Sequence, residues 1–202
     1  MADSKLTALD ALTAVEATDL LYVVDDPGGS PVGKKATAQD VLAVGWKRIA
    51  VVTLADAAAS IALTSIPAAR MLYLEMHGRS SAAGDASVAV TGTFNSDTDN
   101  NYRNTHSTST LVGFLYLGDI TGSQAGNTSF SFAHAWISNI ASMRKHCLAR
   151  SASTWYGTSP MLYEHVGHWV NNSDAISSIN MALADGSNFI AGTQVYLYGM
   201  TL

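Results

Sequence analysis

The most polar loop of the chain contains side chains that could bind a cation. Asp97, Asp99 and Asn101 occupy the first, third and fifth positions of a calcium-binding loop. The pattern then fails, because the sixth position is Tyr102 where glycine is needed and the twelfth is Thr108 where glutamate is needed. We therefore predict no metal here, and instead a long turn whose Asn and Asp side chains bond to their own backbone.

Histidine spacing gives no stronger indication of a metal centre. His165 and His168 are three residues apart, which places them on opposite faces of a strand. His134 and His146 stand alone, and neither an HExxH pattern nor paired Cys and His residues occur in the sequence. We expect packed or rim positions for these side chains, with no metal and no cofactor.

The residue pattern gives little support for catalytic chemistry. Glycoside hydrolysis needs two carboxylates that face each other across a groove, and Glu75 and Glu164 are the only glutamates within expected strands. Nothing in the sequence brings these two together. The sequence also lacks a GxSxG elbow and a glycine-rich phosphate loop. We predict that the chain is not an enzyme and has no catalytic residues, so a depolymerase is the least favoured interpretation.

Aromatic residues gather in the second half of the chain and have two interpretations. Trp136, Trp155, Tyr156, Tyr163 and Trp169 would pack in a core, or would stack on a sugar ring or on a partner's anchor residue. Core packing is the usual role of large aromatic side chains. The two residues that open the segment WYGTSP are the exception, because a segment with Gly and Pro is expected to form an exposed loop.

Four residues are therefore candidate ligand contacts. Trp155 and Tyr156 would present aromatic rings to a glycan or a neighbouring protein from their exposed loop. Asn101 and Tyr102 lie in the polar loop described above and would add further ligand contacts.

Composition restricts the partners of the protein. The 202 residues carry a formal net charge of -5 without a run of basic residues, which argues against nucleic acid. No stretch reaches the roughly 18 apolar residues that membrane insertion needs, and no secretory signal is expected. Charged residues make up only 13% of the chain, as suits a protein that works in an assembly. The single cysteine, Cys147, excludes an internal disulfide and is expected to be buried.

Residues 1–45 differ in pattern from the rest of the chain. Leucines recur there at three-residue spacing, and the apolar run LLYVV, followed by a Pro/Gly turn, predicts a strand. A return strand beginning at Val32 would complete a hairpin, and Thr37 with Asp40 predicts the cap of a short helix over 38–44. This segment is too small to form a core of its own, so we expect it to pack against the rest of the chain or against another protein.

From Trp46 onward the pattern repeats every two residues. Tyr73 and Glu75, for example, alternate with Leu72 and Leu74. Segments bounded by Gly, Asn, Asp or Ser predict strands over 48–54, 70–76, 86–94, 110–117, 128–140, 143–151, 162–170, 176–184 and 194–202. About nine or ten strands with almost no helical pattern predict a mainly β fold, an antiparallel β-sandwich or jelly roll over residues 46–202.

Parts of this pattern resemble a known group of proteins. The leucine-rich lead-in, the segment ATDLLYVVDD, the Pro/Gly turn, Lys34-Lys35 and the short helix are similar to a module near the N-terminus of many tailed-phage fibre and minor structural proteins. The rest resembles the outer β-domains of phage tail and head appendage proteins. These weaker matches lie at 94–97, 101–102, 176–179, 189–193 and 197–199.

The resemblance implies a virion component made in the host cytoplasm: a capsid decoration, a head fibre, or a tail fibre or spike. Residues 1–45 would anchor it to other virion structural proteins, and residues 46–202 would face outward, with a homotrimer as the expected assembly. The anchoring residues would be Leu6, Leu9, Leu12, Leu20, Leu21, Tyr22 and Val23. The alternative is a receptor-binding adhesin whose β-domain loops recognise a host surface polysaccharide.

Overall fold

The structure is a computed structural model. It describes residues 20–25, 32–37, 45–83, 87–104, 111–123, 129–155 and 159–201, and for 20–25, 32–37, 155 and 201 it describes the backbone. The chain divides into two compact units, 1–45 and 46–202. The roles that the sequence analysis assigns to these two parts stay predictions.

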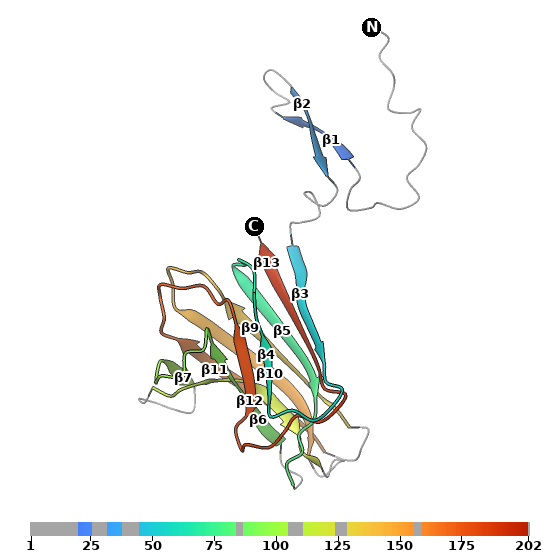
Figure 1. Ribbon diagram of the computed structural model, residues 1–202, viewed down its shortest axis with the longest axis vertical. Helices are drawn as coiled ribbons and strands as arrows, with labels where there is room; N and C mark the ends of the chain where they lie inside the picture. Colours follow the sequence, from blue (N-terminus) through green and yellow to red (C-terminus); the bar gives the residue numbers. More distant parts are fainter. Residues whose placement is uncertain are drawn as a thin grey trace, which may run out of the picture. The chain divides into compact units, whose positions relative to one another are not determined.

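The described part of the first unit is a β-hairpin (Figure 1). Strands β1 (Leu20–Asp25) and β2 (Val32–Thr37) pair antiparallel with each other in a sheet of their own. This pairing confirms the hairpin predicted from the apolar run and the Pro/Gly turn. The predicted helix over 38–44 lies outside the described residues, as do Leu6, Leu9 and Leu12.

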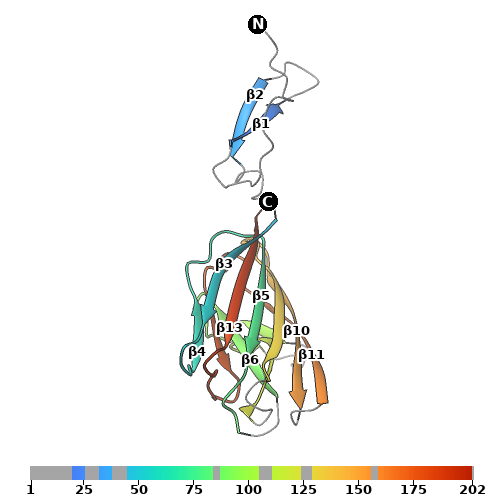
Figure 2. The ribbon, with the colours of Figure 1, turned by 90° about the vertical axis from the view of Figure 1, so that its right-hand side faces the viewer.

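The second unit is built from strands that form two antiparallel sheets (Figure 1 and Figure 2). The strands are β3 (Gly45–Thr53), β4 (Ser60–Leu63), β5 (Met71–Gly78), β6 (Ser87–Phe94), β7 (Tyr102–Asn104), β8 (Leu115–Thr121), β9 (Ser131–Ser138), β10 (Lys145–Trp155), β11 (Ser159–Trp169), β12 (Ile179–Leu183) and β13 (Gln194–Thr201). A seven-stranded sheet has the order β3-β13-β5-β9-β10-β11-β7, and a four-stranded sheet has the order β4-β12-β6-β8. The mainly β, antiparallel fold predicted from the sequence is confirmed.

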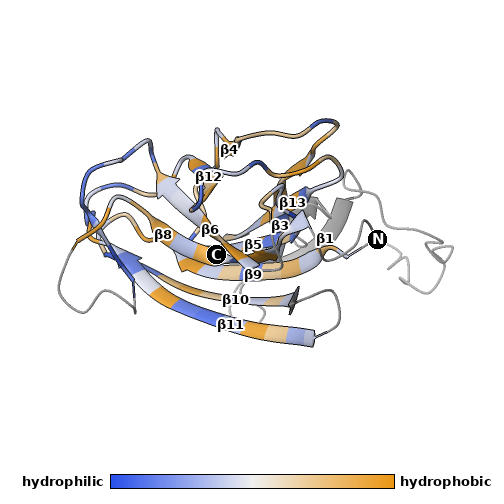
Figure 3. Cartoon of the chain, turned by 90° about the horizontal axis from the view of Figure 1, so that it is seen from below, coloured by the Kyte–Doolittle hydropathy of each residue, from blue (hydrophilic) through white to orange (hydrophobic). Residues whose placement is uncertain are grey.

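The apolar core lies between the two sheets, which Figure 3 shows as separate layers. Alternation along each strand explains why the sheets pack in this way. In β5, Leu72, Leu74 and Met76 are buried, whereas Tyr73 and Glu75 point to the outer face of the seven-stranded sheet and are only half-buried. Strand β5 therefore contributes one apolar face to the core and one face to the surface, and β9 alternates in the same way.

Cys147 also belongs to this core, as the sequence predicts. Its side chain is 2% exposed in β10. Burial raises the pKa of the Cys147 thiol to about 12, so the sulfur stays protonated at neutral pH.

A β-bulge interrupts the regular pairing of β8 with β6. Val90 lies opposite Gly118, whereas the next residue, Thr91, lies opposite Tyr116. Gly118 has a φ of 128°, and a Cβ added there would lie 2.8 Å from the Cβ of Ala133 in the facing sheet. Glycine is therefore required both by the backbone conformation and by the close approach of the two sheets.

Two features of the strand pattern differ from the sequence-based expectation. The strand predicted over 110–117 is displaced, because β8 begins at Leu115 and continues through the bulge to Thr121. Strands β4 and β7 are not predicted at all. They have 4 and 3 residues. In so short a segment, alternation of apolar and polar residues cannot be distinguished from the irregular sequence of a loop.

Candidate functional site

The structure gives Tyr102 a different role from the ligand contact that the sequence predicts. The side chain is fully buried in the core. Its hydroxyl accepts a hydrogen bond from the backbone N–H of Phe94 (2.8 Å) and donates one to the backbone carbonyl of Asp97 (2.9 Å). A side chain in this position has no surface to offer a ligand, so the predicted ligand contact is corrected to a core role.

The polar loop is bonded to itself, as the sequence predicts. The Asp97 carboxylate accepts hydrogen bonds from the backbone N–H of Asp99 (3.0 Å) and from the side-chain amide of Asn101 (3.0 Å). It also accepts one from the indole N–H of Trp169 (2.7 Å), a core residue that is 1% exposed. Among the described residues, no group of three or more His, Cys, Asp and Glu side chains could hold a metal ion.

The other predicted contact residues are only partly described. Trp155 ends β10, and its backbone alone is described; Tyr156 lies outside the described residues. For Leu20 to Val23 of the predicted anchor, the backbone in β1 is described and the side chains are not. The structure therefore does not bring the predicted contact residues together into one site.

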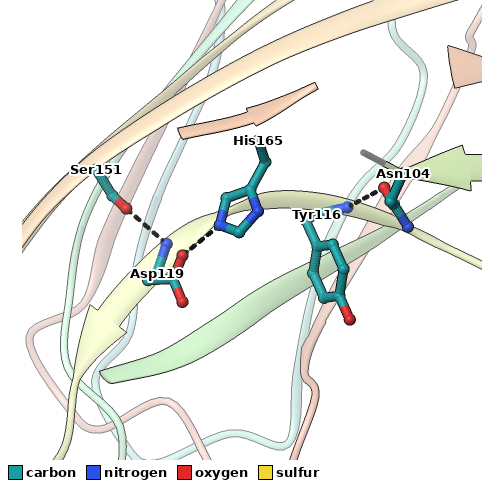
Figure 4. Close-up of polar contacts among 5 residues, drawn as sticks. All are labelled: Asn104, Tyr116, Asp119, Ser151 and His165. Atoms are coloured by element: carbon teal, nitrogen blue, oxygen red, sulfur yellow. Dashed lines mark hydrogen bonds and ion pairs between the residues drawn. The ribbon is translucent and has the colours of Figure 1, made fainter. Parts of the chain in front are cut away.

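A buried Asp, His and Ser cluster resembles a hydrolytic triad in composition but not in geometry (Figure 4). His165 Nε2 pairs with the carboxylate of Asp119. Ser151 Oγ, however, accepts a hydrogen bond from the backbone N–H of Asp119 at 2.8 Å, so the serine is bonded to the aspartate backbone. A triad needs a serine that is bonded to the histidine and open to substrate. All three residues are buried, and the cluster connects β8 of the smaller sheet with β10 and β11 of the larger.

Asn104 makes a similar connection beside this cluster (Figure 4). Its side-chain carbonyl accepts a hydrogen bond from the backbone N–H of Tyr116 at 3.1 Å, and its amide donates one to the carbonyl of Phe114 at 3.0 Å. The Tyr116 ring lies 5.2 Å from the His165 ring, measured between centroids. Asn104 therefore joins β7 to β8, beside the Asp119–His165 pair that joins β8 to β11.

His165 and His168 lie on opposite faces of β11, as their spacing predicts. His165 points inward to Asp119, and His168 lies on the outer face with its ring centroid 5.4 Å from that of His146. Burial lowers the pKa of His168 below its ordinary value of 6.5, and the nearby charges of His146, Arg144 and Arg103 lower this pKa further.

The outer face of the seven-stranded sheet gathers aromatic side chains from four strands. Antiparallel register places Tyr73 of β5 directly between Tyr198 of β13 and Trp136 of β9. Trp46 of the edge strand β3 contacts this row, with its ring 5.2 Å from the Trp136 ring and 6.1 Å from the Tyr73 ring. We call these four residues, together with Glu75, the aromatic surface.

The aromatic surface is concave and exposed to solvent. Trp46 and Trp136 are 41% and 38% exposed, which is unusual for such large apolar side chains. Its five residues line a pocket of about 370 Å³. Exposed aromatic residues beside a carboxylate are typical of a binding site, because each ring combines a large apolar face with polar edges or groups.

The structure defines the orientation of the Glu75 carboxylate and the protonation of the Tyr73 hydroxyl. The Glu75 carboxylate is bonded to His77 Nε2 at 3.0 Å, which fixes its orientation. Partial burial raises the pKa of Tyr73 above its ordinary value of 10.0, and Glu75 and Tyr198 raise it further. The Tyr73 hydroxyl therefore keeps its proton at neutral pH and is a hydrogen-bond donor as well as an acceptor.

Only part of this surface is predicted from the sequence. Trp136 is one of the aromatic residues with two interpretations, and the repeat of two residues places Tyr73 and Glu75 on one strand face. Nothing in the sequence connects these three residues with Trp46 or Tyr198. The signal that could connect them is the presence of an outward aromatic residue in each of several strands. This signal is informative only when the order of the strands in the sheet is known, and that order depends on pairing between residues far apart in the sequence.

No protein-family model matches this chain, and no curated protein matches it either. Within the part of the chain that the structure describes, no helix is long and apolar enough to cross a membrane.

Proposed function

We propose that the protein is a structural component of the surface of a tailed-phage virion. Residues 1–45 attach it to another virion protein, and residues 46–202 form an outward β-domain that assembles as a trimer. The sequence resemblance to phage fibre and minor structural proteins motivates this proposal.

One observation carries the anchoring role of the first unit. Strands β1 and β2 form a two-stranded sheet of their own. An isolated two-stranded hairpin is at best marginally stable in water, because it cannot bury both of its faces. A hairpin of this size gains stability when it packs on another protein, and this is what an attachment module does.

The strand order supports a jelly roll for the β-domain. The larger sheet contains the order β3-β13-β5-β9, and the smaller sheet has the order β4-β12-β6-β8. A jelly roll places eight strands in two sheets in this alternating order, so β7 and the β10–β11 hairpin are additions to it. Jelly rolls occur in viral capsid proteins and in lectins, an analogy at the level of the fold.

Immunogold labelling of intact virions tests the location. Antibody raised against residues 46–202 should label the particle surface, at the head for a capsid decoration or head fibre and at the tail for a fibre or spike. Particles that lack the protein serve as the control. Absence of label from intact particles, with the protein recovered only from the lysate, would contradict the proposal.

Mass measurement in solution tests the trimer. Size-exclusion chromatography with light scattering should give three times the chain mass of 21.2 kDa for the full chain. A mass of one chain at micromolar concentration would contradict the trimer and leave the virion location to the labelling experiment.

A further inference from the structure

The pocket of the aromatic surface lies on a sheet face, away from the loops in which the sequence analysis places its ligand contacts. We propose that this pocket binds a neutral saccharide: the rings of Trp46 and Trp136 stack on the apolar faces of sugar rings, and Glu75 accepts hydrogen bonds from sugar hydroxyls. This inference goes beyond the structural role proposed above and does not depend on it.

The ring geometry provides a floor and a side wall. Tyr73 and Trp136 lie on adjacent strands with centroids 4.6 Å apart and planes at 44°, and Tyr198 continues the row with its centroid 6.0 Å from that of Tyr73. Trp46 is steeply inclined to this floor, at 74° to Trp136 and 67° to Tyr73. A sugar ring has apolar C–H faces and a polar rim, so it can stack on one ring while its edge contacts the other.

The polar groups fit the hydroxyls of such a ligand. A carboxylate has two oxygens that accept several hydrogen bonds, so the bond with His77 orients Glu75 and leaves acceptor capacity for hydroxyl donors. Protonated Tyr73 and the hydroxyl of Tyr198 can donate or accept. The pocket therefore combines apolar stacking faces with a small number of orienting polar groups, as small-molecule sites do.

The shape of the aromatic surface favours a chain of sugars over a small organic cation. Tyr73, Trp136 and Tyr198 would contact a ligand from below and Trp46 from one side, whereas a quaternary ammonium cage places rings around the cation. The row also continues through Leu148 of β10 and Val166 of β11, which are 38% and 43% exposed. From β13 to β11 the row spans four strand spacings, about 19 Å, room for several sugar units.

Charges beside the row argue against a second copy of the chain as the occupant. The next row on the same face contains Glu75, and in β10 and β11 the exposed pair Arg150 and Glu164. Interfaces between identical chains are depleted of charged residues at their centre, whereas small-molecule sites combine apolar and aromatic lining with a few polar or charged groups. A polar, flexible sugar chain therefore fits this mixed face better than a second copy does.

The test is a binding screen with purified full-length protein. An array of neutral oligosaccharides, including cellohexaose and maltohexaose, identifies a ligand that calorimetric titration then measures. Choline chloride is titrated in parallel. We expect binding of at least one neutral oligosaccharide, and Trp136→Ala or Trp46→Ala should each weaken it roughly tenfold, the effect of losing one anchor contact.

Two further variants keep the result interpretable. Glu75→Gln preserves size and should also weaken binding, which separates the polar contact from loss of an aromatic ring. Leu162→Ala, in an exposed residue of β11 far from the pocket, should leave affinity unchanged. Thermal melts of every variant show that the fold is intact, as expected for exposed positions.

Three results would overturn the proposal: no oligosaccharide binds, affinity is unchanged in the Trp variants, or choline binds in a way that the Trp variants abolish. A concentration-dependent dimer lost in Trp136→Ala would also overturn it, since the surface would then be covered by a second copy. All these measurements use purified protein without virions. A negative result would therefore overturn the saccharide site and leave the proposed virion location untouched.

Discussion

At the scale of single residues, the pair formed by Asp119 and His165 has the largest expected effect on stability. Both side chains are about nine-tenths buried, and they join β8 of one sheet to β11 of the other. Removing one partner of a buried pair leaves the other polar group without compensation for its lost hydration. The pair is therefore a structural connection between the sheets.

We predict that His165→Ala lowers the free energy of unfolding by roughly 3–5 kcal/mol, because Asp119 then stays buried without its partner. Urea denaturation measures this loss. The matched control is Arg150→Ala, which breaks the pair that Arg150 makes with Glu164 on the outer face, where both side chains are about half exposed. That change should cost less than about 1 kcal/mol, and equal losses for the two variants would contradict this assignment.

His168 predicts a dependence of stability on pH. Its pKa in the folded protein lies below the ordinary value of 6.5, so the unfolded chain binds a proton first as pH falls. His168 therefore reduces stability as the pH falls through 6.5 toward its lower folded pKa. Urea midpoints at pH 7.5 and pH 5.5 should show a smaller acid-induced loss for His168→Gln than for the wild-type protein, and an equal loss would count against it.

Single residues also show what sequence reasoning can and cannot predict. The spacing of His165 and His168 predicts their opposite faces, because strand geometry is local. The burial of Tyr102 is not predicted, since its partners include Trp169 and Phe94, which come from other strands. Tyr102 has polar neighbours in the sequence, which led to the wrong prediction of a ligand contact. Its environment is determined by packing against distant strands.

At the scale of secondary-structure elements, the bulge at Gly118 determines how closely β8 approaches the larger sheet. We predict that Gly118→Val destabilises the β-domain by several kcal/mol, because left-handed strain of roughly 1–3 kcal/mol adds to a clash with Ala133. Gly186→Ala is the control, since Gly186 also has positive φ but nothing lies within 4 Å of an added Cβ. Chemical denaturation of both variants compares them, and similar losses would show that the close approach is unimportant.

The same element shows why strand boundaries are hard to predict. The apolar run before Gly118 has a repeat of two residues, but the bulge shifts the pairing and extends the strand to Thr121. Regular strands such as β5 and β9 are predicted well because successive side chains alternate between the core and the outer face of the sheet. Strands β4 and β7 gain their order from neighbours, β12 and β11, that are distant in the sequence.

At the scale of the whole molecule, the sequence predicts a mainly β chain with a distinct N-terminal part, but not the order of its strands. The order β3-β13-β5-β9 joins the two ends of the β-domain, and such long-range pairing leaves no local signal. The aromatic surface depends on this order, because Trp46 and Tyr198 line one pocket only when β3 and β13 are neighbours in the sheet. The sequence shows that these aromatic residues are present, but it does not show that they lie together in one pocket.

We propose that the two units have separate roles, attachment for 1–45 and an outward β-domain for 46–202. The most direct measurement compares how the full chain and a fragment of residues 46–202 bind to virions that lack the protein, with circular dichroism as the control for folding. We predict that the fragment keeps its β spectrum and no longer binds to particles, whereas the full chain binds. A folded fragment that decorates the particles as fully as the full chain would show that residues 1–45 are not the attachment module.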